Sequence, residues 1–275
     1  MSGEAFPEGL NPLERFGREV REVRKGRKIT QRQLGKAVQY SDGYVSKVEA
    51  GTLMPSEKFA RGCDLAFGTH GLFLRLLRRV EEGDHPSWFL PYLELERKAA
   101  SILDFSTTSI MGMLQTEDYA RAVFRAGHPR EAADLITGRV AARVRRRQIL
   151  EQEDPPTLWV VLHESCLRTL VGGRSVMADQ LEHLLHMSET PGVDIQVIPF
   201  AAGAAGSHTL AFTLLAFADE STALYVDDVP HGGRLYRSES SVRIALENYD
   251  RLRAHALPPD DSRALITSVH KEFRP

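Results

Sequence analysis

Residues 29–56 read ITQRQLGKAVQYSDGYVSKVEAGTLMPS, and this stretch decides the fold of the N-terminal part of the chain. Thr30 and Gln33 have the T-x-x-Q spacing of a capping box, in which each side chain bonds the backbone N–H of the other residue at a helix start. Ser41 is a suitable N-cap for a second helix, and Gly51 can end that helix. The stretch therefore predicts two short helices that are joined by a tight turn.

Helical periodicity continues on both sides of this stretch. Apolar residues recur at helical spacing over residues 13–23, 57–67 and 72–80. The sequence therefore predicts a mainly α-helical domain of five helices over residues 13–80, preceded by a disordered arm at residues 1–12.

Charge is distributed unevenly along the chain. Residues 1–80 hold 15 Lys and Arg against 9 Asp and Glu, a net charge of +6, whereas the remainder holds 20 against 28, a net charge of −8. A basic segment joined to an acidic one directs the basic segment toward a polyanion and keeps the acidic one away from it.

After residue 80, the regular helical pattern ends. Residues 81–87, EEGDHPS, combine Gly, Pro and charge without periodicity, which predicts a linker. Beyond it, runs rich in Val, Ile and Leu predict strands, and helical patterns surround them. The predicted strands are 100–106, 157–163, 193–200, 210–218 and 223–229, and the predicted helices are 88–98, one capped by Thr116, 132–153, 175–189, 241–254 and 260–273. This order predicts a larger α+β domain over residues 88–275, with a small mixed sheet and surrounding helices.

The composition is that of an ordinary globular protein. The sequence is 42% hydrophobic, but no run approaches the ~18 apolar residues that a membrane helix needs. The first residues lack the basic start and apolar core of a secretory signal. Cys63 and Cys166 have no CxxC or metal-binding spacing. We therefore expect a cytoplasmic protein with no membrane segment and no disulfide.

The stretch 29–56 resembles the Xre family of helix-turn-helix regulators almost position by position. In such motifs, the second helix enters the DNA major groove and the first helix rests on the DNA backbone. The resemblance implies a set of DNA-binding residues, which are Gln31, Arg32, Ser41, Asp42, Gly43, Tyr44, Ser46 and Lys47.

The same resemblance assigns roles within this set. Gln31 is expected to contact a phosphate at the start of its helix. Asp42, Gly43, Ser46 and Lys47 take the base-reading positions, where Lys47 can reach guanine acceptors and Asp42 can accept from cytosine. Gly43 offers no side chain and instead permits close approach of the backbone. A solvated surface charge is the alternative for Lys47.

One pair of charged residues has an expected structural role. The resemblance implies that Glu49 is a buried carboxylate paired with Arg24 of the first helix. The alternative is an unrelated surface pair, which would contribute little to stability.

The C-terminal region also carries a resemblance. It is similar to the C-terminal domain of an actinobacterial, toxin–antitoxin-like group of Xre regulators. The similarity lies in five segments, which read MLQTEDYARAVFRA, VAAR, DPPTLWVVLHE, MADQLEHLL and IQVIPF. Members of this group are commonly encoded beside a small BldB-like protein. The resemblance therefore implies a small BldB-like protein partner for this domain.

Catalytic and metal-binding patterns are incomplete. The HE at residues 163–164 lacks the second His of an H-E-x-x-H zinc site. His183 and His186 lie one turn apart on a predicted helix, but the sequence offers no convincing third ligand. The SH at residues 207–208 lacks the strand–turn–helix setting of a nucleophile elbow. The sequence therefore predicts no enzymatic activity, no metal and no cofactor.

Two further segments invite functional interpretations. Residues 139–147 include five arginines, of which Arg139, Arg143, Arg146 and Arg147 form one stripe at helical spacing. We expect a solvated or interdomain face for this stripe, with a second DNA contact as the alternative. The small residues at 201–206 predict a flexible connection, with a loop that folds over a ligand as the alternative.

Together, these observations predict a sequence-specific, antitoxin-like transcriptional regulator that binds double-stranded DNA. We expect a homodimer that reads a short, two-fold symmetric operator, with a C-terminal domain that supplies dimerisation and binds the small protein partner. The alternative is a regulator whose C-terminal domain senses a small effector molecule or a peptide.

Overall fold

A computed structural model of the chain describes residues 12–82, 89–206, 208–226 and 233–274. The chain divides into two compact units, Met1–His85 with Arg130–Ala142 and Pro86–Pro129 with Arg143–Pro275. We call them the helical unit and the sheet unit. The predicted arm and linker lie outside the described residues, apart from Pro12 at the start of the first helix and Glu81 and Glu82 at the end of the fifth, where the helix continues into the segment expected to be the linker.

The helical unit contains the five predicted helices. They are α1 (Pro12–Gly26), α2 (Gln31–Val38), α3 (Asp42–Glu49), α4 (Glu57–Phe67) and α5 (Leu72–Glu82). Their apolar stripes meet in one core, in which Phe16 of α1, Leu34 of α2, Val45 of α3 and Phe59 of α4 are fully buried. Each helix is too short to be stable alone, so this shared core supplies most of the stability.

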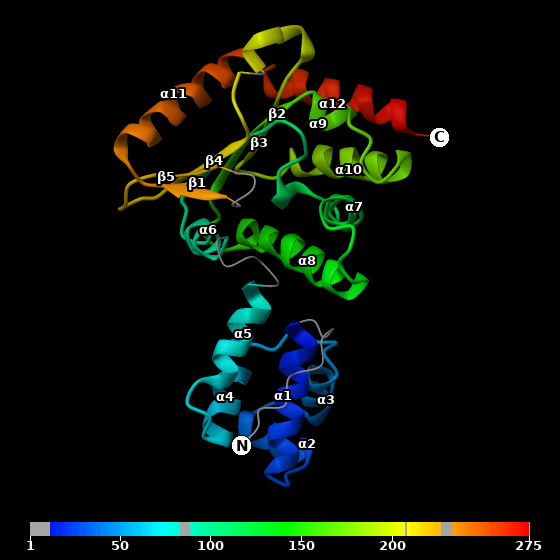
Figure 1. Cartoon of the computed structure of the whole chain (residues 1–275), viewed down its shortest axis with the longest axis vertical. Coiled ribbons are helices and arrows are strands. Elements are labelled where there is room, and N and C mark those ends of the chain that lie inside the picture. The colour runs from blue at the N-terminus through cyan, green and yellow to red at the C-terminus, as the bar shows by residue number, and fades with distance from the viewer. Residues whose placement is uncertain (1–11, 83–88, 207, 227–232, 275) are drawn as a thin grey trace. The chain divides into compact units, whose positions relative to one another are not determined.

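The sheet unit is an α+β domain, as predicted (Figure 1). Its strands are β1 (Ser101–Ser106), β2 (Thr157–His163), β3 (Val193–Ile198), β4 (Phe212–Ala216), β5 (Ala223–Val226) and β6 (Arg234–Tyr236). Its main helices are α6 (Leu90–Glu96), α7 (Glu117–Gly127), α9 (Ser165–Arg168), α10 (Arg174–Met187), α11 (Glu239–His255) and α12 (Pro259–Phe273), and α8 (Ala133–Arg145) runs across the division between the units. Short 3₁₀ segments are η1 (Gly112–Leu114), η2 (Arg146–Glu151) and η3 (Phe200–Gly206).

The six strands form one mixed sheet in the order β3-β2-β1-β4-β5-β6. The first three strands are parallel, whereas β4 pairs antiparallel with β1, and β5 and β6 continue the antiparallel half. Parallel strands need helical crossovers, which α7 to α10 provide, while the antiparallel strands follow one another through shorter connections.

The two faces of the sheet are covered to different extents. One face packs against α6, α7, α9, α10 and α12, whose apolar side chains join it in the largest core. On the opposite face, α11 is the one α-helix among the described residues that contributes to the core, through Val242, Ala245, Tyr249 and Leu252. Figure 1 shows α11 on one side of the sheet and α10 and α12 on the other.

Several boundaries differ from the prediction. The helix expected over residues 132–153 ends at Arg145, and its second half is the 3₁₀ segment η2. The break coincides with Arg146, whose guanidinium turns inward to the buried Glu96. Residues 201–206, expected to be a flexible connection, instead lie within the 3₁₀ turns of η3. The short elements α9 and β6 were not predicted, because three or four residues carry no readable periodicity.

No helix in the described ranges has the length and apolar character that a membrane span requires.

Candidate nucleic-acid interface

The starts of α2 and α3 are fixed by the capping residues that the sequence indicated. The Gln33 backbone N–H donates to Thr30 Oγ1 at 3.1 Å, and the Thr30 N–H donates to Gln33 Oε1 at 2.7 Å, so the capping box is complete. Ser41 caps α3 by accepting from the Tyr44 N–H at 3.1 Å. These caps satisfy backbone donors that would otherwise lack partners, and they set the directions of both helices.

The path of the chain between the helices requires close approach and an unusual backbone conformation. A Cβ on Gly35 would lie 2.6 Å from the Tyr40 carbonyl oxygen, so only glycine fits there. Gln39 ends α2 in the left-handed conformation with φ 63°. This conformation is unfavourable for a residue with a Cβ atom, so the turn stores some strain at Gln39.

Two tyrosines brace the turn against α4. The rings of Tyr40 and Tyr44 stack with a centroid distance of 4.3 Å, and both contact Phe59. The Tyr40 hydroxyl lies 2.5 Å from Ser56 Oγ, and the Ser56 N–H donates to the Tyr44 hydroxyl at 3.0 Å. Ser56 is itself the N-cap of α4. The start of α3 is therefore held rigidly against the rest of the helical unit.

Glu49, at the C-terminal end of α3, is held by side chains of α1 and α2. Its side chain is fully buried, and it accepts from Arg24 Nε at 2.5 Å and from Arg24 Nη2 at 3.0 Å. The Gln31 side-chain amide donates to Glu49 Oε2 at 2.8 Å, and the Arg21 Nε lies 3.6 Å from the same oxygen. The expected Arg24–Glu49 pair is thus formed, and it joins α1, α2 and α3.

The environment of Glu49 keeps it ionised. Burial raises the pKa of its carboxyl, but the hydrogen bonds from Arg24 and Gln31 and the charges of Arg24 and Arg21 more than compensate, so the pKa lies below the ordinary value of 4.5. The hydrogen bond to Glu49 correspondingly raises the pKa of Arg24.

Sequence reasoning missed two members of this cluster. Arg21 lies one turn before Arg24, and this i, i+3 spacing was the available signal. Gln31 was expected to contact phosphate, yet its amide is bonded to Glu49. Because the N–H groups of Gln31 and Arg32 open α2 and have no intrahelical acceptor, the backbone at this helix start still offers donors to an anion.

The expected base-reading positions share one exposed face. Asp42, Gly43, Ser46 and Lys47 are all exposed, while Val45 and Val48, on the opposite side of α3, are fully buried. Arg32 and Ser41 are also exposed, and Ser41 acts as a cap. Tyr44 is half-buried, with its ring and hydroxyl engaged in the tyrosine brace.

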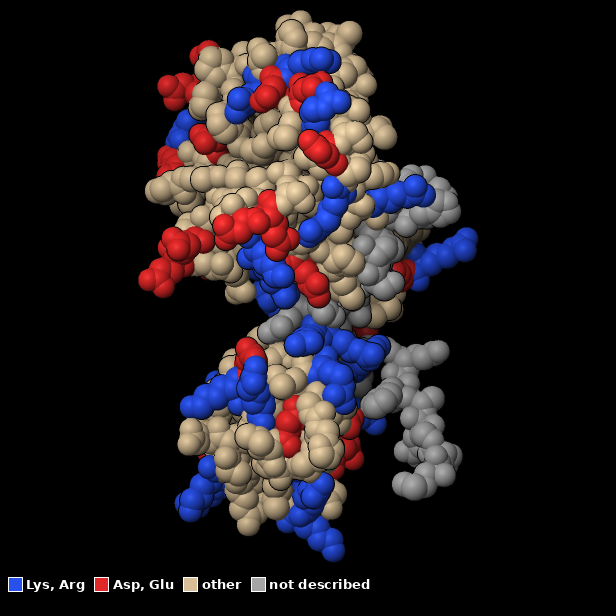
Figure 2. All heavy atoms as spheres, turned by 90° about the vertical axis from the view of Figure 1, so that its left-hand side faces the viewer, with Lys and Arg blue, Asp and Glu red and all other residues tan. Residues whose placement is uncertain are grey.

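The surface around this face is basic. The first turn of α2 contributes the exposed Arg32, its last turn contributes Lys36, and the last turn of α3 contributes Lys47. Figure 2 shows Lys and Arg side chains projecting from several sides of the helical unit. This distribution suits a surface that approaches phosphate groups.

The arginine stripe at residues 139–147 has a different role from the one expected. Arg146 forms a buried ion pair with Glu96 at 2.6 Å, and its guanidinium lies over the ring of Phe89. Arg143 donates to Gln115 Oε1 at 2.9 Å, and Arg147 donates to the Gln115 carbonyl oxygen at 2.7 Å. These three arginines therefore bind partners within the sheet unit, and the expectation of a solvated face is wrong for them.

Comparison with known proteins finds two family models, which match different parts of the chain. A family model described as a helix-turn-helix domain matches residues 15–77. A second model, described as a domain of unknown function (DUF5753), matches residues 89–268. No curated protein and no solved structure matches the chain.

Proposed function

The chain belongs to the DUF5753 family, and because a helix-turn-helix domain precedes the family domain, we propose that the protein is a sequence-specific transcriptional regulator. The helix-turn-helix domain itself indicates DNA binding. The observation that carries the proposal is the exposed face of Asp42, Gly43, Ser46 and Lys47 on α3, a helix held from behind by the buried Glu49.

In the proposed mechanism, α3 lies in the major groove and its exposed face reads base edges. Lys47 donates to guanine acceptors, and Asp42 accepts from the amino group of cytosine. The opening backbone N–H groups of α2 and the side chain of Arg32 contact phosphates, which position the protein on the duplex.

The proposal includes a homodimer that acts in the cytoplasm. A single α3 reads only a few base pairs, so two copies on a two-fold symmetric operator give a longer and more selective site. We assign dimerisation to the sheet unit. Sedimentation of the full chain at the concentrations used for DNA binding tests this assignment, because a monomer that binds one half-site would exclude it.

We further propose an antitoxin-like, non-enzymatic role for the DUF5753 domain, in which it binds a small BldB-like protein. The resemblance of its sequence strings to the toxin–antitoxin-like regulators supports this role. Co-purification from the native cell followed by mass spectrometry tests it. A stoichiometric small protein is expected, and its absence would leave the domain without this partner.

DNA binding is tested with the full chain and a random duplex library. Repeated selection should enrich a short sequence that the wild-type protein binds with much higher affinity than the unselected library. Lys47→Glu should abolish the preference, because it places a negative charge on the face that meets the bases. The matched control is Lys271→Glu, which makes the same charge change at an exposed site in α12. Failure to enrich any sequence, or equal loss in both variants, would contradict the proposal.

A further inference from the structure

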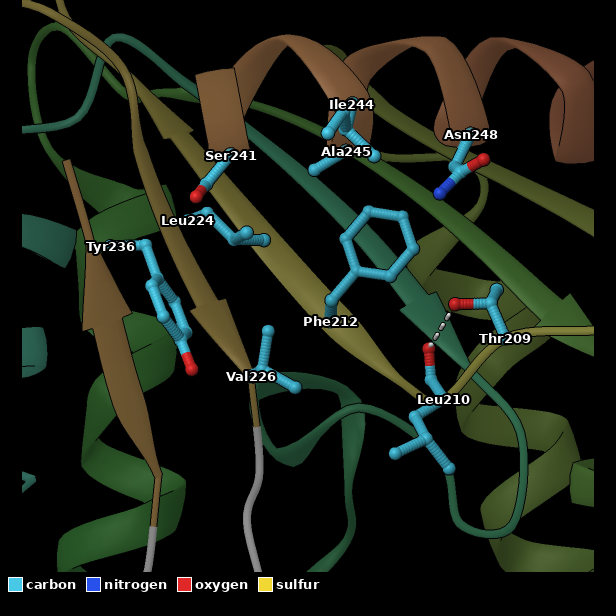
Figure 3. Close-up of a pocket in the computed structure, with 10 residues that line it drawn as sticks. All are labelled: Thr209, Leu210, Phe212, Leu224, Val226, Tyr236, Ser241, Ile244, Ala245 and Asn248. Carbon is cyan, nitrogen blue, oxygen red and sulfur yellow. Dashed lines mark hydrogen bonds between the residues drawn. The ribbon is translucent and has the colours of Figure 1, made fainter. Parts of the chain in front are cut away.

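A pocket of about 370 Å³ opens on the less covered face of the sheet, between α11 and the antiparallel strands (Figure 3). Its volume lies at the lower end of the range of about 300–1,000 Å³ that is typical of small-molecule sites. Phe212 of β4 and Leu224 and Val226 of β5 form the strand side, and Ile244 and Ala245 of α11 lie opposite them.

The strand side of the pocket is preformed. Phe212 and Val226 are directly paired across the β4–β5 ladder, which fixes the spacing of their side chains. Phe212 and Leu224 are buried in the core that α11 shares with the sheet. A ligand would therefore meet an ordered apolar surface and would not have to organise it.

The rim exposes an unusual amount of apolar surface. Leu210 is 71% exposed, Ile244 is 53% exposed and Tyr236 of β6 is 37% exposed. These three side chains all line the same pocket. Apolar groups gathered around one concavity are typical of a binding site, whereas exposed apolar residues that are scattered singly need no explanation.

None of the described residues that line the pocket is charged. Its polar lining residues are Thr209, Ser241 and Asn248, which are all neutral. A charged ligand group would lose its hydration here without gaining an ionic partner, which is costly. The lining therefore selects an uncharged ligand.

Asn248 supplies a polar contact point. Within the described part of the chain, no hydrogen bond joins its side-chain amide to another residue, and Figure 3 shows this amide on the pocket side of α11. An amide offers both a donor and an acceptor. Ser241 lies two turns away on the same helix and accepts from the Ser238 hydroxyl, which leaves its own hydroxyl hydrogen available.

We propose that this pocket binds an uncharged, mainly apolar small molecule that carries a hydrogen-bonding group directed at Asn248. The apolar body of the ligand packs between the β4–β5 surface and α11, and covers Ile244 and Tyr236. This inference concerns the sheet unit and does not depend on DNA binding by the helical unit.

The test uses the full chain and N-phenyl-1-naphthylamine, a neutral apolar dye that fluoresces when it leaves water. We expect saturable binding of one dye per chain. Anilinonaphthalene sulfonate has the same aromatic skeleton with an added negative charge, and it should bind at least about tenfold more weakly, because the pocket offers its sulfonate no cation.

Two variants of α11 locate the site. Ile244→Glu places a carboxylate at the rim, and we expect it to weaken dye binding by about tenfold or more. Leu246→Glu makes the matched change two residues away, at a position that is also exposed but does not line the pocket, and it should leave the affinity within about twofold. Both sites are solvent-accessible, so both variants should fold, and thermal unfolding verifies this.

Three results of the dye-binding measurements would overturn the proposal. They are the absence of saturable binding of the neutral dye, equal affinities for the two dyes, and equal effects of Ile244→Glu and Leu246→Glu in folded protein. Hydrogen exchange with and without the neutral dye gives a further readout. Protection is expected in α11 and β4–β5, and protection confined to other elements would place the site elsewhere.

Discussion

Lys47 is exposed, and it carries the only positive charge of α3. We predict that Lys47→Ala weakens binding to the selected operator by about 1–3 kcal/mol, as expected for the loss of a base contact, and relaxes the preference at one base pair. Binding assays at fixed salt on operator and on random DNA check this prediction. An equal loss on both would show that Lys47 contacts phosphate.

Glu49, two residues further along, acts on stability. We predict that Glu49→Ala lowers the free energy of unfolding by about 3 kcal/mol, because it leaves the partly buried Arg24 guanidinium without its carboxylate. The control is Glu57→Ala, which removes a highly exposed i, i+4 pair with Arg61 and should cost under about 0.5 kcal/mol. Urea unfolding measures both. An unchanged stability of Glu49→Ala combined with lost DNA affinity would mean that Glu49 serves DNA binding directly.

His183 of α10 should make the fold sensitive to mild acid. Burial and the charge of Arg147 lower its pKa from 6.5 to about 4, and its Nε2 atom is buried without a hydrogen-bond partner among the described residues. The folded state therefore requires the neutral imidazole, while the unfolded chain takes up a proton below pH 6.5. We predict that stability falls as the pH drops from 6.5 toward 4.

The variant His183→Leu should lose this component of the pH dependence, whereas replacing the exposed His255 by Leu should retain it. Unfolding curves across the range check the prediction. Glu49 acts in a different pH window. Its pKa is lowered in the folded state, so its contribution is complete above pH 4.5 and is lost only as the pH falls through the lower folded value. A wild-type stability that is flat between pH 6.5 and 4.5 would contradict the role of His183.

At the scale of the element, the end of α2 offers a stabilising change. Gln39 adopts a left-handed conformation with φ 63°, which glycine accepts without steric cost. We predict that Gln39→Gly raises the free energy of unfolding by about 0.5–1 kcal/mol, the relieved strain exceeding the added entropy of the unfolded chain. Gln39→Ala should give no such gain, because alanine retains the Cβ atom. Similar stabilities of the two variants would show that Gln39 is unstrained.

Elements with local signals were predictable from sequence. Thr30, Ser41 and Thr116 cap helices where their side chains indicated, because a cap involves residues only three positions apart. The strand β2 and the helix α4 match their predicted bounds, since each has a clear period and clear stops.

Features that depend on distant partners were not predictable from the residues alone. The break after α8 follows the pairing of Arg146 with Glu96, which lies 50 positions away. The bond from Gln31 to Glu49 spans 18 positions and exists only when α2 and α3 have packed. The apolar pocket likewise combines residues of β4, β5, β6 and α11, and no local sequence pattern predicted it.

At the scale of the whole molecule, the uneven charge predicts how DNA binding responds to salt. With a net charge of +6 in residues 1–80, binding should release condensed counterions. We predict that the logarithm of operator affinity falls linearly with the logarithm of salt concentration, by roughly 0.9 for each phosphate contacted. Titration of the full chain at several salt concentrations measures this slope. A slope near zero would exclude phosphate contacts as the main source of affinity.

The neutral dye provides an internal comparison in the same protein. The dye is neutral, and no charged side chain is present among the described residues of its proposed site, so its affinity should not fall as salt rises. A parallel decline of both affinities would indicate that salt changes the fold instead of screening the DNA contacts.

The arrangement of α3 also bears on how such regulators diverge. The contacts that hold this helix include those of Tyr44, Val45, Val48 and Glu49. The side chains of Ser46 and Lys47, by contrast, make no hydrogen bond to the rest of the described chain. Of the proposed base-reading side chains, Ser46 and Lys47 are therefore separate from the residues that hold the helix in place. After gene duplication, a few substitutions on the exposed face of α3 can therefore change the operator that one copy binds without lowering the stability of the fold. The same substitutions offer a route to engineer a new DNA specificity on this fold.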